Sequence, residues 1–286
     1  MSEPEVFSLV TEENITLYAD LHRAKTNRKN VTIIYFHGGG LLYGVRDDLP
    51  ELYINTFLNA GYDFLALDYL LAPESKLDQI IKSASDMLCF YLQNTDSVFK
   101  LKNTKYVLFG RSAGAYLCFM LCDRLIKSKS LLPTAIVSLY GYTRLDEVQF
   151  NTPSKHYNKL ASIPVESIEK IISDAPVTYG LMDSRFSLYI KARQEGTWAK
   201  YLCGSTDPAN YSLNDEILAS FPPTILAAAT LDPDVPYRMS KSLLKLIPNS
   251  HLITIYGETH DFDREVHNES GRVTYDEIIE WLEDRV

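Results

Sequence analysis

Short, nearly continuous apolar runs alternate along most of the chain with longer segments in which apolar residues recur every three or four positions. Runs of the first kind are typical of parallel strands covered on both faces, and segments of the second kind indicate amphipathic helices. Their alternation predicts an α/β fold with a mostly parallel, doubly wound sheet. The predicted strands are residues 31–36, 62–67, 106–109, 134–139, 224–229 and 251–255, and the predicted helices are residues 49–59, 77–93, 113–126, 237–246 and 273–283.

Two regions depart from this rhythm. Apolar and polar residues partly alternate in residues 6–10 and 15–21, which predicts an antiparallel hairpin ahead of the parallel strands. Residues 141–220 separate two predicted strands, and a loop of that length without structure of its own would be anomalous. We therefore predict a mainly helical cap inserted at residues 141–220 into a core of residues 1–140 and 221–286. Within the cap, helices are expected at residues 164–173, 184–193 and 213–220.

The insertion is rich in aromatic residues, for which two interpretations are open. They form the insertion's own core, or some of them line an acyl pocket. These residues are Tyr157, Tyr179, Phe186, Tyr189, Trp198 and Tyr201.

The composition is that of a globular protein, with 46% hydrophobic and 23% charged residues in a chain of 286. The net charge of −9 predicts a surface that repels nucleic acid and anionic lipid, and no apolar run approaches the roughly eighteen residues that span a bilayer. Residues 1–5 carry acids where an export signal would carry bases, so we expect a cytoplasmic protein without stable membrane association. A homodimer is compatible with all of these features.

Four cysteines, at positions 89, 118, 122 and 203, are spread through a chain large enough to fold without disulfides, so free thiols are expected. Cys118 and Cys122 are four residues apart on a predicted helix, which would suit a metal-ligand pair, but a pair of small buried residues is the favoured interpretation. No cluster of histidine and cysteine completes a zinc site. We therefore predict neither a metal nor an organic cofactor.

The sequence Gly-Arg-Ser-Ala-Gly at residues 110–114 lies between an apolar run, residues 105–109, and a helical run, residues 115–126. A serine flanked by glycines in a strand–turn–helix context is typical of a nucleophile elbow, in which the hydroxyl stands above the sheet. The pattern predicts acyl transfer with Ser112 as the nucleophile. By itself the five-residue pattern is weak, because most matches of this length are ordinary loops.

A second motif strengthens the prediction. The predicted strand at residues 31–36 ends in His37-Gly38-Gly39-Gly40. Backbone amides in such a loop stabilise the negative charge that develops on a carbonyl oxygen during acyl transfer, and glycines leave room for the substrate. The amide of Ala113, at the start of the helix after Ser112, is expected to add another donor.

A serine nucleophile needs an imidazole and a carboxylate, expected in the order Ser, Asp or Glu, His. His260 follows the predicted strand 251–255 at its carboxyl end, where open α/β sheets build their sites, and His267 is the reserve. Asp232 directly follows the predicted strand 224–229, and Asp234, on what we expect to be an exposed turn, is the second choice.

These motifs together resemble the hormone-sensitive-lipase-like branch of the α/β hydrolases, the relatives of carboxylesterases and acetyl esterases. The resemblance implies Ser112 as nucleophile with Asp232 and His260 as its partners. It also implies that short acyl esters are cleaved without a cofactor, and that the amides of three residues form the oxyanion hole. The three are Gly39, Gly40 and Ala113. The motifs are His37–Gly40, Asp68-Tyr69-Leu70-Leu71-Ala72-Pro73-Glu74, Gly110–Gly114, Pro222-Pro223-Thr224, Asp232-Pro233 and His260 with Phe262.

The chain departs from that branch at several positions. Arg111 replaces a common aspartate, Ala115 a common third glycine and Leu70 a usual arginine. The large insertion at residues 141–220 also differs from the branch, whose cap is built mainly from N-terminal helices. These departures leave the serine chemistry intact and bear on the choice of substrate.

The sequence therefore predicts a hydrolase that cleaves small-molecule carboxylic esters through an acyl-enzyme on Ser112. A peptidase or amidase with the same three residues is one alternative, and a non-catalytic small-molecule-binding protein is another. Because the imidazole must be neutral to accept a proton, we expect the rate to fall as the pH drops through about 6.5, the ordinary histidine pKa.

Overall fold

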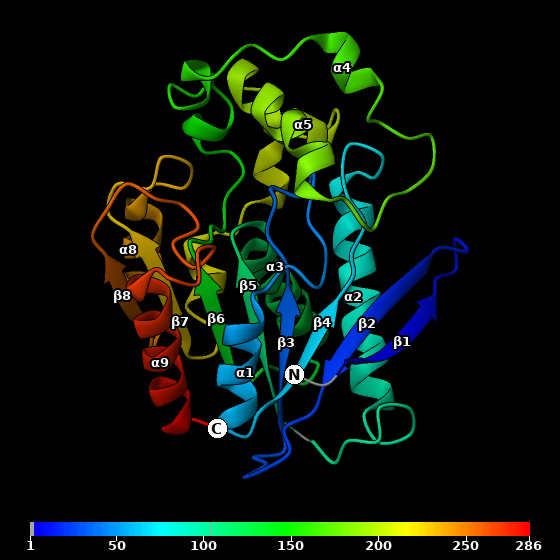
Figure 1. Cartoon of the computed structure of the whole chain (residues 1–286), viewed down its shortest axis with the longest axis vertical. Helices are drawn as coiled ribbons and strands as arrows, with labels where there is room; N and C mark the ends of the chain where they lie inside the picture. The colour runs from blue at the N-terminus through cyan, green and yellow to red at the C-terminus, as the bar shows by residue number, and fades with distance from the viewer. Residues whose placement is uncertain (1–2, 104) are drawn as a thin grey trace.

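The structure is a computed structural model that describes residues 3–103 and 105–286. Residues 1–2 belong both to the predicted core and to the acidic N-terminal stretch considered above, and residue 104 belongs to the predicted core; all three lie outside the described residues. A central sheet has the strand order β1-β2-β4-β3-β5-β6-β7-β8, with helices on both faces (Figure 1). The strands are β1 (Glu5–Val10), β2 (Thr16–His22), β3 (Val31–Phe36), β4 (Asp63–Leu67), β5 (Lys105–Arg111), β6 (Ala135–Leu139), β7 (Thr224–Ala229) and β8 (His251–Ile255).

Pairing in the sheet follows the hydrophobic pattern. Strands β1 and β2 form the antiparallel hairpin, β2 pairs antiparallel with β4, and the remaining neighbours are parallel. Every residue of β3, β4, β6 and β7 is buried, as near-continuous apolar runs require, whereas β1 at the edge alternates between exposed and half-buried positions. The predicted α/β-hydrolase type of sheet is confirmed.

Two apolar clusters hold the helices against the sheet. Helices α1 (Glu51–Asn59) and α9 (Glu269–Glu283) contribute to the cluster on one face. Helices α2 (Leu77–Asn94), α3 (Ala113–Ser128) and α8 (Tyr237–Leu246) contribute to the other. Within the described part of the chain, no helix combines the length and apolar character that crossing a bilayer requires.

The inserted region lies above the carboxyl ends of the parallel strands (Figure 1). Its aromatic residues Phe150, Tyr157, Tyr189 and Trp198 belong to the same apolar cluster as α2 and α3, so the insertion does not pack around a core of its own. Tyr179 is half exposed and takes no part in that cluster. Its elements are the helices α4 (Val165–Glu169), α5 (Met182–Glu195), α6 (Trp198–Cys203) and α7 (Asp215–Leu218) and the short 3₁₀ turns η1 (Val148–Phe150), η2 (Tyr157–Lys159) and η3 (Pro208–Tyr211).

Candidate active site

Ser112 lies in the tight turn between β5 and α3. Its backbone has φ +51° and ψ −114°, a conformation that residues other than glycine seldom adopt. A Cβ at Gly110 would collide with the backbone of Gly114, and a Cβ at Gly114 would collide with the carbonyl of Phe36. Gly110 is therefore needed where the end of β5 packs against the start of α3, and Gly114 where α3 packs against the end of β3, while the positive φ falls on the serine itself.

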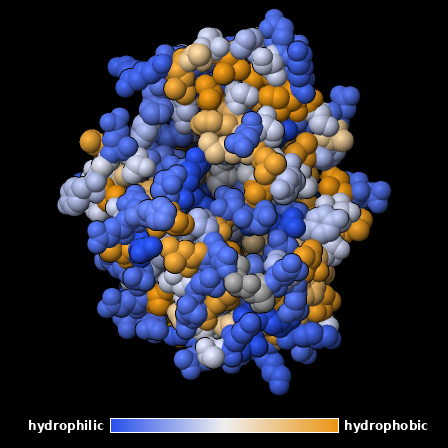
Figure 2. Space-filling model, in the orientation of Figure 1, coloured by the Kyte–Doolittle hydropathy of each residue, from blue (hydrophilic) through white to orange (hydrophobic). Residues whose placement is uncertain are grey.

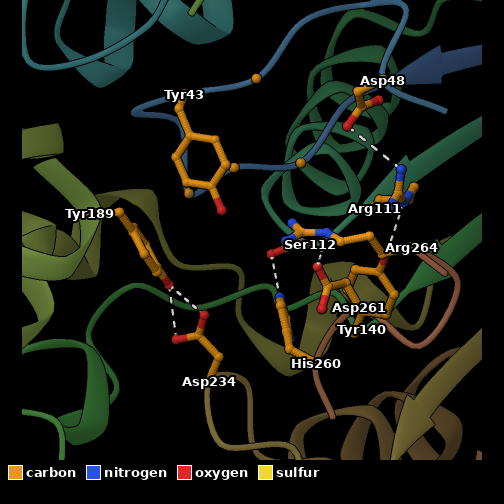
Figure 3. A pocket seen from close by; sticks show the side chains of 14 residues that line it. Tyr43, Asp48, Arg111, Ser112, Tyr140, Tyr189, Asp234, His260, Asp261 and Arg264 are labelled. Carbon is orange, nitrogen blue, oxygen red and sulfur yellow. Dashed lines mark hydrogen bonds and ion pairs between the residues drawn. The ribbon is translucent and has the colours of Figure 1, made fainter. Parts of the chain in front are cut away.

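Three side chains from distant parts of the sequence meet at this turn, and Figure 3 shows two of them, Ser112 and His260. The Ser112 Oγ lies 2.9 Å from His260 Nε2, and His260 Nδ1 lies 2.7 Å from Asp232 Oδ2. Asp232 is itself fixed, because its Oδ1 accepts the backbone amides of Asp234 and Val235. A proton on Nδ1 leaves Nε2 as an acceptor for the serine hydroxyl.

The surroundings of His260 favour its charged form. Burial disfavours the imidazolium, but the charge and hydrogen bond of Asp232 outweigh burial and raise the pKa of His260 to about 9. Asp234 and Asp261 act in the same direction. The expectation of an unperturbed pKa near 6.5 is therefore wrong for this side chain, and the neutral form that can accept a proton requires a higher pH.

The three glycines after His37 form a loop beside Ser112. Gly39 and Gly40 have φ values of +100° and +60°, which suit glycine. The His37 Nδ1 donates to the Gly38 carbonyl at 2.8 Å, since a carbonyl can only accept. The buried Tyr69 hydroxyl donates to the His37 carbonyl at 2.8 Å.

These bonds orient the loop amides. The carbonyl of Gly39 accepts the amides of Leu42 and Tyr43, each at 3.1 Å. In a planar trans peptide the N–H points opposite to the preceding C=O, so fixing the carbonyls of Gly38 and Gly39 fixes the N–H directions of Gly39 and Gly40. Both glycines line the pocket in front of the serine.

The cap contributes to the same loop. The indole Nε1 of Trp198, a buried residue of α6, donates to the Gly40 carbonyl at 2.9 Å. The ring of Tyr189, on α5, lies so close that a Cβ at Gly40 would collide with it. The backbone of this loop is thus held from the cap side as well as from the core.

Ala113 begins helix α3, and its amide is the first of the helix. The carbonyl of Ser112 accepts the amide of Tyr116 at 3.1 Å, which turns the Ala113 N–H away from the helix interior. An N–H at a helix N-terminus adds the favourable end of the helix dipole for a negative charge. Ala113 itself is fully buried.

The pocket in front of Ser112 is small and polar, with a cavity volume of about 50 Å³. Figure 2 shows a hollow below the cap helices on the face that it draws, and Figure 3 shows the side chains around Ser112. None of the described residues that line the pocket has an aliphatic side chain. The lining residues are Gly38, Gly39, Gly40, Tyr43, Gly44, Asp48, Arg111, Ser112, Tyr140, Tyr189, Asp234, His260, Asp261 and Arg264.

Asp234 differs from its prediction. It is 5% exposed rather than on an exposed turn, because three cap side chains bind it. The hydroxyls of Tyr157 and Tyr189 donate to its carboxylate at 3.0 and 2.9 Å, and Arg193 Nη1 lies 2.8 Å from Oδ1. Asp234 therefore binds the cap, and Asp232 is the acid in contact with His260. The reserve histidine, His267, is exposed and does not line the pocket.

A second group of buried side chains lies next to the serine turn. Arg111 Nε donates to the Tyr140 hydroxyl at 2.8 Å and lies 3.2 Å from Asp263 Oδ2. Burial disfavours the guanidinium charge, but Asp263, Tyr140, Tyr35 and Asp48 together outweigh burial and raise the pKa of Arg111 further above its ordinary value. Arg111 therefore remains charged, and it lines the pocket.

No group of three or more His, Cys, Asp and Glu side chains among residues 3–103 and 105–286 is arranged to hold a metal ion. Cys118 and Cys122 are both buried, and burial is the main cause of their raised thiol pKa values. A metal-bound cysteine would be a thiolate, which these surroundings disfavour.

Comparison with known proteins agrees with this geometry. The family model described as the alpha/beta hydrolase fold matches residues 33–264, which is most of the chain and includes Ser112, Asp232 and His260. The chain is an α/β hydrolase.

Solved and curated relatives of this α/β hydrolase support the resemblance to the hormone-sensitive-lipase-like branch. An alpha/beta hydrolase superfamily protein from Enterococcus faecalis is 31% identical with a TM-score of 0.84, over 99% of each chain. An ethyl acetate hydrolase from Pseudomonas putida is 25% identical over 63% of this chain and 57% of its own length. A hormone-sensitive lipase from Ictidomys tridecemlineatus is 24% identical over 52% of this chain and 19% of its own length. The chain thus spans less than two thirds of these curated relatives.

Sequence reasoning missed several residues of this α/β hydrolase site. Tyr43 and Arg264 line the pocket without belonging to any motif that the sequence offered. Arg193 was not singled out, because a basic residue on a helix is usually solvated. The aromatic content of the insertion gave a partial signal in the sequence. In the structure, four of its aromatic rings lie within 6 Å of the Arg193 guanidinium, at Phe150, Tyr157, Tyr189 and Trp198.

Proposed function

We propose that this α/β hydrolase cleaves carboxylic esters with short acyl groups through an acyl-enzyme on Ser112. The observation that carries the proposal is the continuous hydrogen-bond chain from Ser112 through His260 to Asp232, next to a glycine loop whose carbonyls are bound elsewhere. The esterase names of curated relatives support the same reaction class.

The chemistry begins at the serine. Ser112 Oγ attacks the ester carbonyl as its proton passes to His260 Nε2, and Asp232 holds the resulting imidazolium. The carbonyl oxygen takes the negative charge, and the amides of Gly39, Gly40 and Ala113 donate to it. Loss of one such donor typically costs about 3 kcal/mol of transition-state stabilisation.

Collapse of this intermediate expels the alcohol, which takes the proton from His260, and leaves the acyl group on Ser112. A water molecule then gives a proton to His260 and attacks the acyl-enzyme. A second collapse releases the acid and restores the serine hydroxyl. Each proton that leaves a nucleophile is returned to a leaving oxygen, so the cycle needs no cofactor.

The size and polarity of the pocket support short acyl groups. Its volume of about 50 Å³ holds a few water molecules, whereas pockets for drug-sized ligands usually exceed about 300 Å³. A long alkyl chain would have to lie against charged side chains such as Asp48 and Arg264 and would displace their water without replacing its hydrogen bonds.

The test is ester hydrolysis by the purified full chain and by the Ser112→Ala variant. We expect turnover of p-nitrophenyl acetate to exceed that of the octanoate ester, and Ser112→Ala to lower kcat by at least about a thousandfold. Ser242→Ala, on the exposed face of α8, is the matched control and should retain the wild-type rate.

Three results would contradict the proposal. Retained turnover in Ser112→Ala would remove the serine from the mechanism. Faster cleavage of aminoacyl amides than of matched esters would favour a peptidase. Failure of a fluorophosphonate probe to label Ser112, with no turnover of any ester, would favour a binding protein.

We also infer a reducing, cytoplasmic location. The inference is supported by Cys89, Cys118, Cys122 and Cys203, all of which are free thiols. Recovery of the tagged full chain in an exported fraction with oxidised cysteines would contradict it.

A further inference from the structure

Arg111 immediately precedes the serine, at a position where the related branch commonly has aspartate. Its side chain is 7% exposed, and Asp263, the carboxylate that it meets, is fully buried. A buried charge without a partner is strongly unfavourable, so this arginine and this aspartate depend on each other.

Asp263 lies three residues after His260, on the same loop. Its Oδ2 accepts the Tyr275 hydroxyl at 2.8 Å and lies 3.2 Å from Arg111 Nε, while its Oδ1 accepts the Tyr140 hydroxyl at 2.6 Å. The arginine at the end of β5 is therefore bound directly to the loop that carries the imidazole.

Tyr140 connects the same groups by a second route. Its hydroxyl accepts from Arg111 and donates to Asp263, and its ring lies against the imidazole of His260, with 4.7 Å between ring centroids. The backbone of Tyr140 has φ +42°, and its amide donates to the Ala227 carbonyl at 2.6 Å. A tyrosine held in this uncommon conformation by β7 presents a fixed surface to the imidazole.

We propose that Arg111 is a positioning residue: through Tyr140 and Asp263 it fixes the loop that carries the catalytic imidazole. The inference rests on the proposed function, because it concerns the distance between the imidazole and the Ser112 hydroxyl. It assigns the effect of Arg111 to the rate of the chemical step rather than to substrate binding.

The geometry separates this role from substrate binding. Arg111 Nε is occupied by Tyr140 and Asp263, and Nη1 is directed to Asp48 Oδ2 at 3.6 Å and to the Tyr35 hydroxyl at 3.5 Å. The Nε edge of the guanidinium thus holds protein groups together, and this is the edge on which the positioning role rests.

The experiment compares the steady-state kinetics of wild type, Arg111→Met, Tyr140→Phe and Arg111→Met/Asp263→Asn. We expect kcat for p-nitrophenyl acetate to fall by about tenfold to a hundredfold in Arg111→Met, with KM nearly unchanged, because a misplacement of about 1 Å costs rate. Tyr140→Phe keeps the ring and loses both hydroxyl bonds, so a smaller loss of kcat is expected.

The double variant guards against misfolding, since it removes both buried charges together. If the two residues act as one unit, kcat in the double variant is no lower than in Arg111→Met, whereas independent effects would multiply. Arg28→Met/Asp63→Asn is the matched control, an ion pair at the amino end of β4 that is remote from the pocket, and it should leave kcat unchanged.

A readout without substrate separates this inference from the proposed function. The His260 Nδ1 proton bound to Asp232 should give a low-field proton resonance in wild type, and Arg111→Met should broaden or shift it even if no ester is turned over. A wild-type kcat in Arg111→Met, a raised KM with unchanged kcat, or an unchanged resonance would each overturn the positioning role.

Discussion

The imidazole of His260 lies between a serine hydroxyl and a carboxylate, and its charge decides whether the serine can be activated. Its pKa is raised to about 9 because the attraction of Asp232 outweighs burial. A raised pKa means that the neutral form, which accepts the proton, predominates only at higher pH. In the proposed mechanism the protonated imidazole cannot accept the serine proton, so the rate should rise as His260 loses its proton.

The pH dependence of kcat/KM follows from this sign. We expect it to fall as the pH drops, with a midpoint above 6.5 and towards pH 9. In Asp261→Asn the midpoint should move to lower pH, because Asp261 also raises the pKa of His260. Rates of p-nitrophenyl acetate hydrolysis from pH 5 to 10 measure both midpoints, and a flat profile or a wild-type midpoint at 6.5 or below would contradict the expectation.

Single residues were predictable where chemistry restricts the choice. Only a few histidines and acids follow Ser112 at strand ends, and strand-end position selected His260 and Asp232 from them. The burial of Asp234 was not predictable, because its partners Tyr189 and Arg193 lie far away in the sequence and reach it only through the fold of the insertion. Local sequence shows an aspartate near prolines, which is typical of a surface turn.

At the level of elements, the short helix α6 joins the cap to the glycine loop. Trp198 at its start is 1% exposed and donates its indole N–H to the Gly40 carbonyl. The carbonyl of Gly40 needs a donor because it is enclosed by the cap, and an unsatisfied buried polar group costs about 1–3 kcal/mol. The bond therefore holds the loop in the conformation that the glycines permit.

Trp198→Phe tests this contact, because it removes the indole donor and keeps an aromatic ring at the site. We expect kcat to fall by about tenfold and the free energy of unfolding to fall by about 1–3 kcal/mol, because the Gly40 carbonyl loses its donor. Trp281→Phe on α9 is the control, since Trp281 packs on the far cluster away from the pocket. Kinetics and urea unfolding measure the two effects, and equal losses of kcat in both variants would contradict a specific role for Trp198.

Elements were predictable in proportion to their length and periodicity. The strands and the long helices of the core were found within a few residues, but α9 begins at Glu269, four residues before its predicted start, because Asn268 caps it. In the insertion, α4 is only five residues long and α6, with six, was not predicted. Helices of one or two turns show too few repeats of the apolar pattern to be distinguished from loops.

At the level of the whole molecule, the insertion is bound to the sheet region by a buried arginine. Arg185 on α5 donates to both carboxylate oxygens of Glu74 and to the carbonyls of Leu42 and Ala72. Burial would raise the pKa of Glu74, but the hydrogen bonds of Arg185 help to outweigh burial and lower it. The insertion shares one apolar cluster with the core, and the division at residues 141–220 stays a prediction.

Arg185→Met should destabilise the entire fold. The Glu74 side chain is 1% exposed, and removing one partner of a buried ion pair typically costs about 3–5 kcal/mol. Because the pKa of Glu74 is lowered in the folded state, the stabilisation is present above its ordinary value of 4.5 and is lost as the pH falls through the folded-state pKa. Urea unfolding at pH 7 and pH 4 should show a large difference from wild type that shrinks at the lower pH.

A matched control is Arg238→Met, which removes an exposed ion pair with Glu147 and should change the free energy of unfolding little. An Arg185→Met protein as stable as the control variant would contradict the expectation. Loss of the cap signal in a separate, earlier transition would show that the cap unfolds independently of the sheet.

The absence of aliphatic side chains among the described lining of the pocket has a consequence for where such an enzyme finds its substrates. A pocket lined by carboxylates, guanidinium groups and phenols remains hydrated, so contact with an oil surface would not stabilise it. Under the proposed function we therefore expect the substrates to be esters dissolved in water, with a rate that follows their dissolved concentration and does not rise when an oil phase forms.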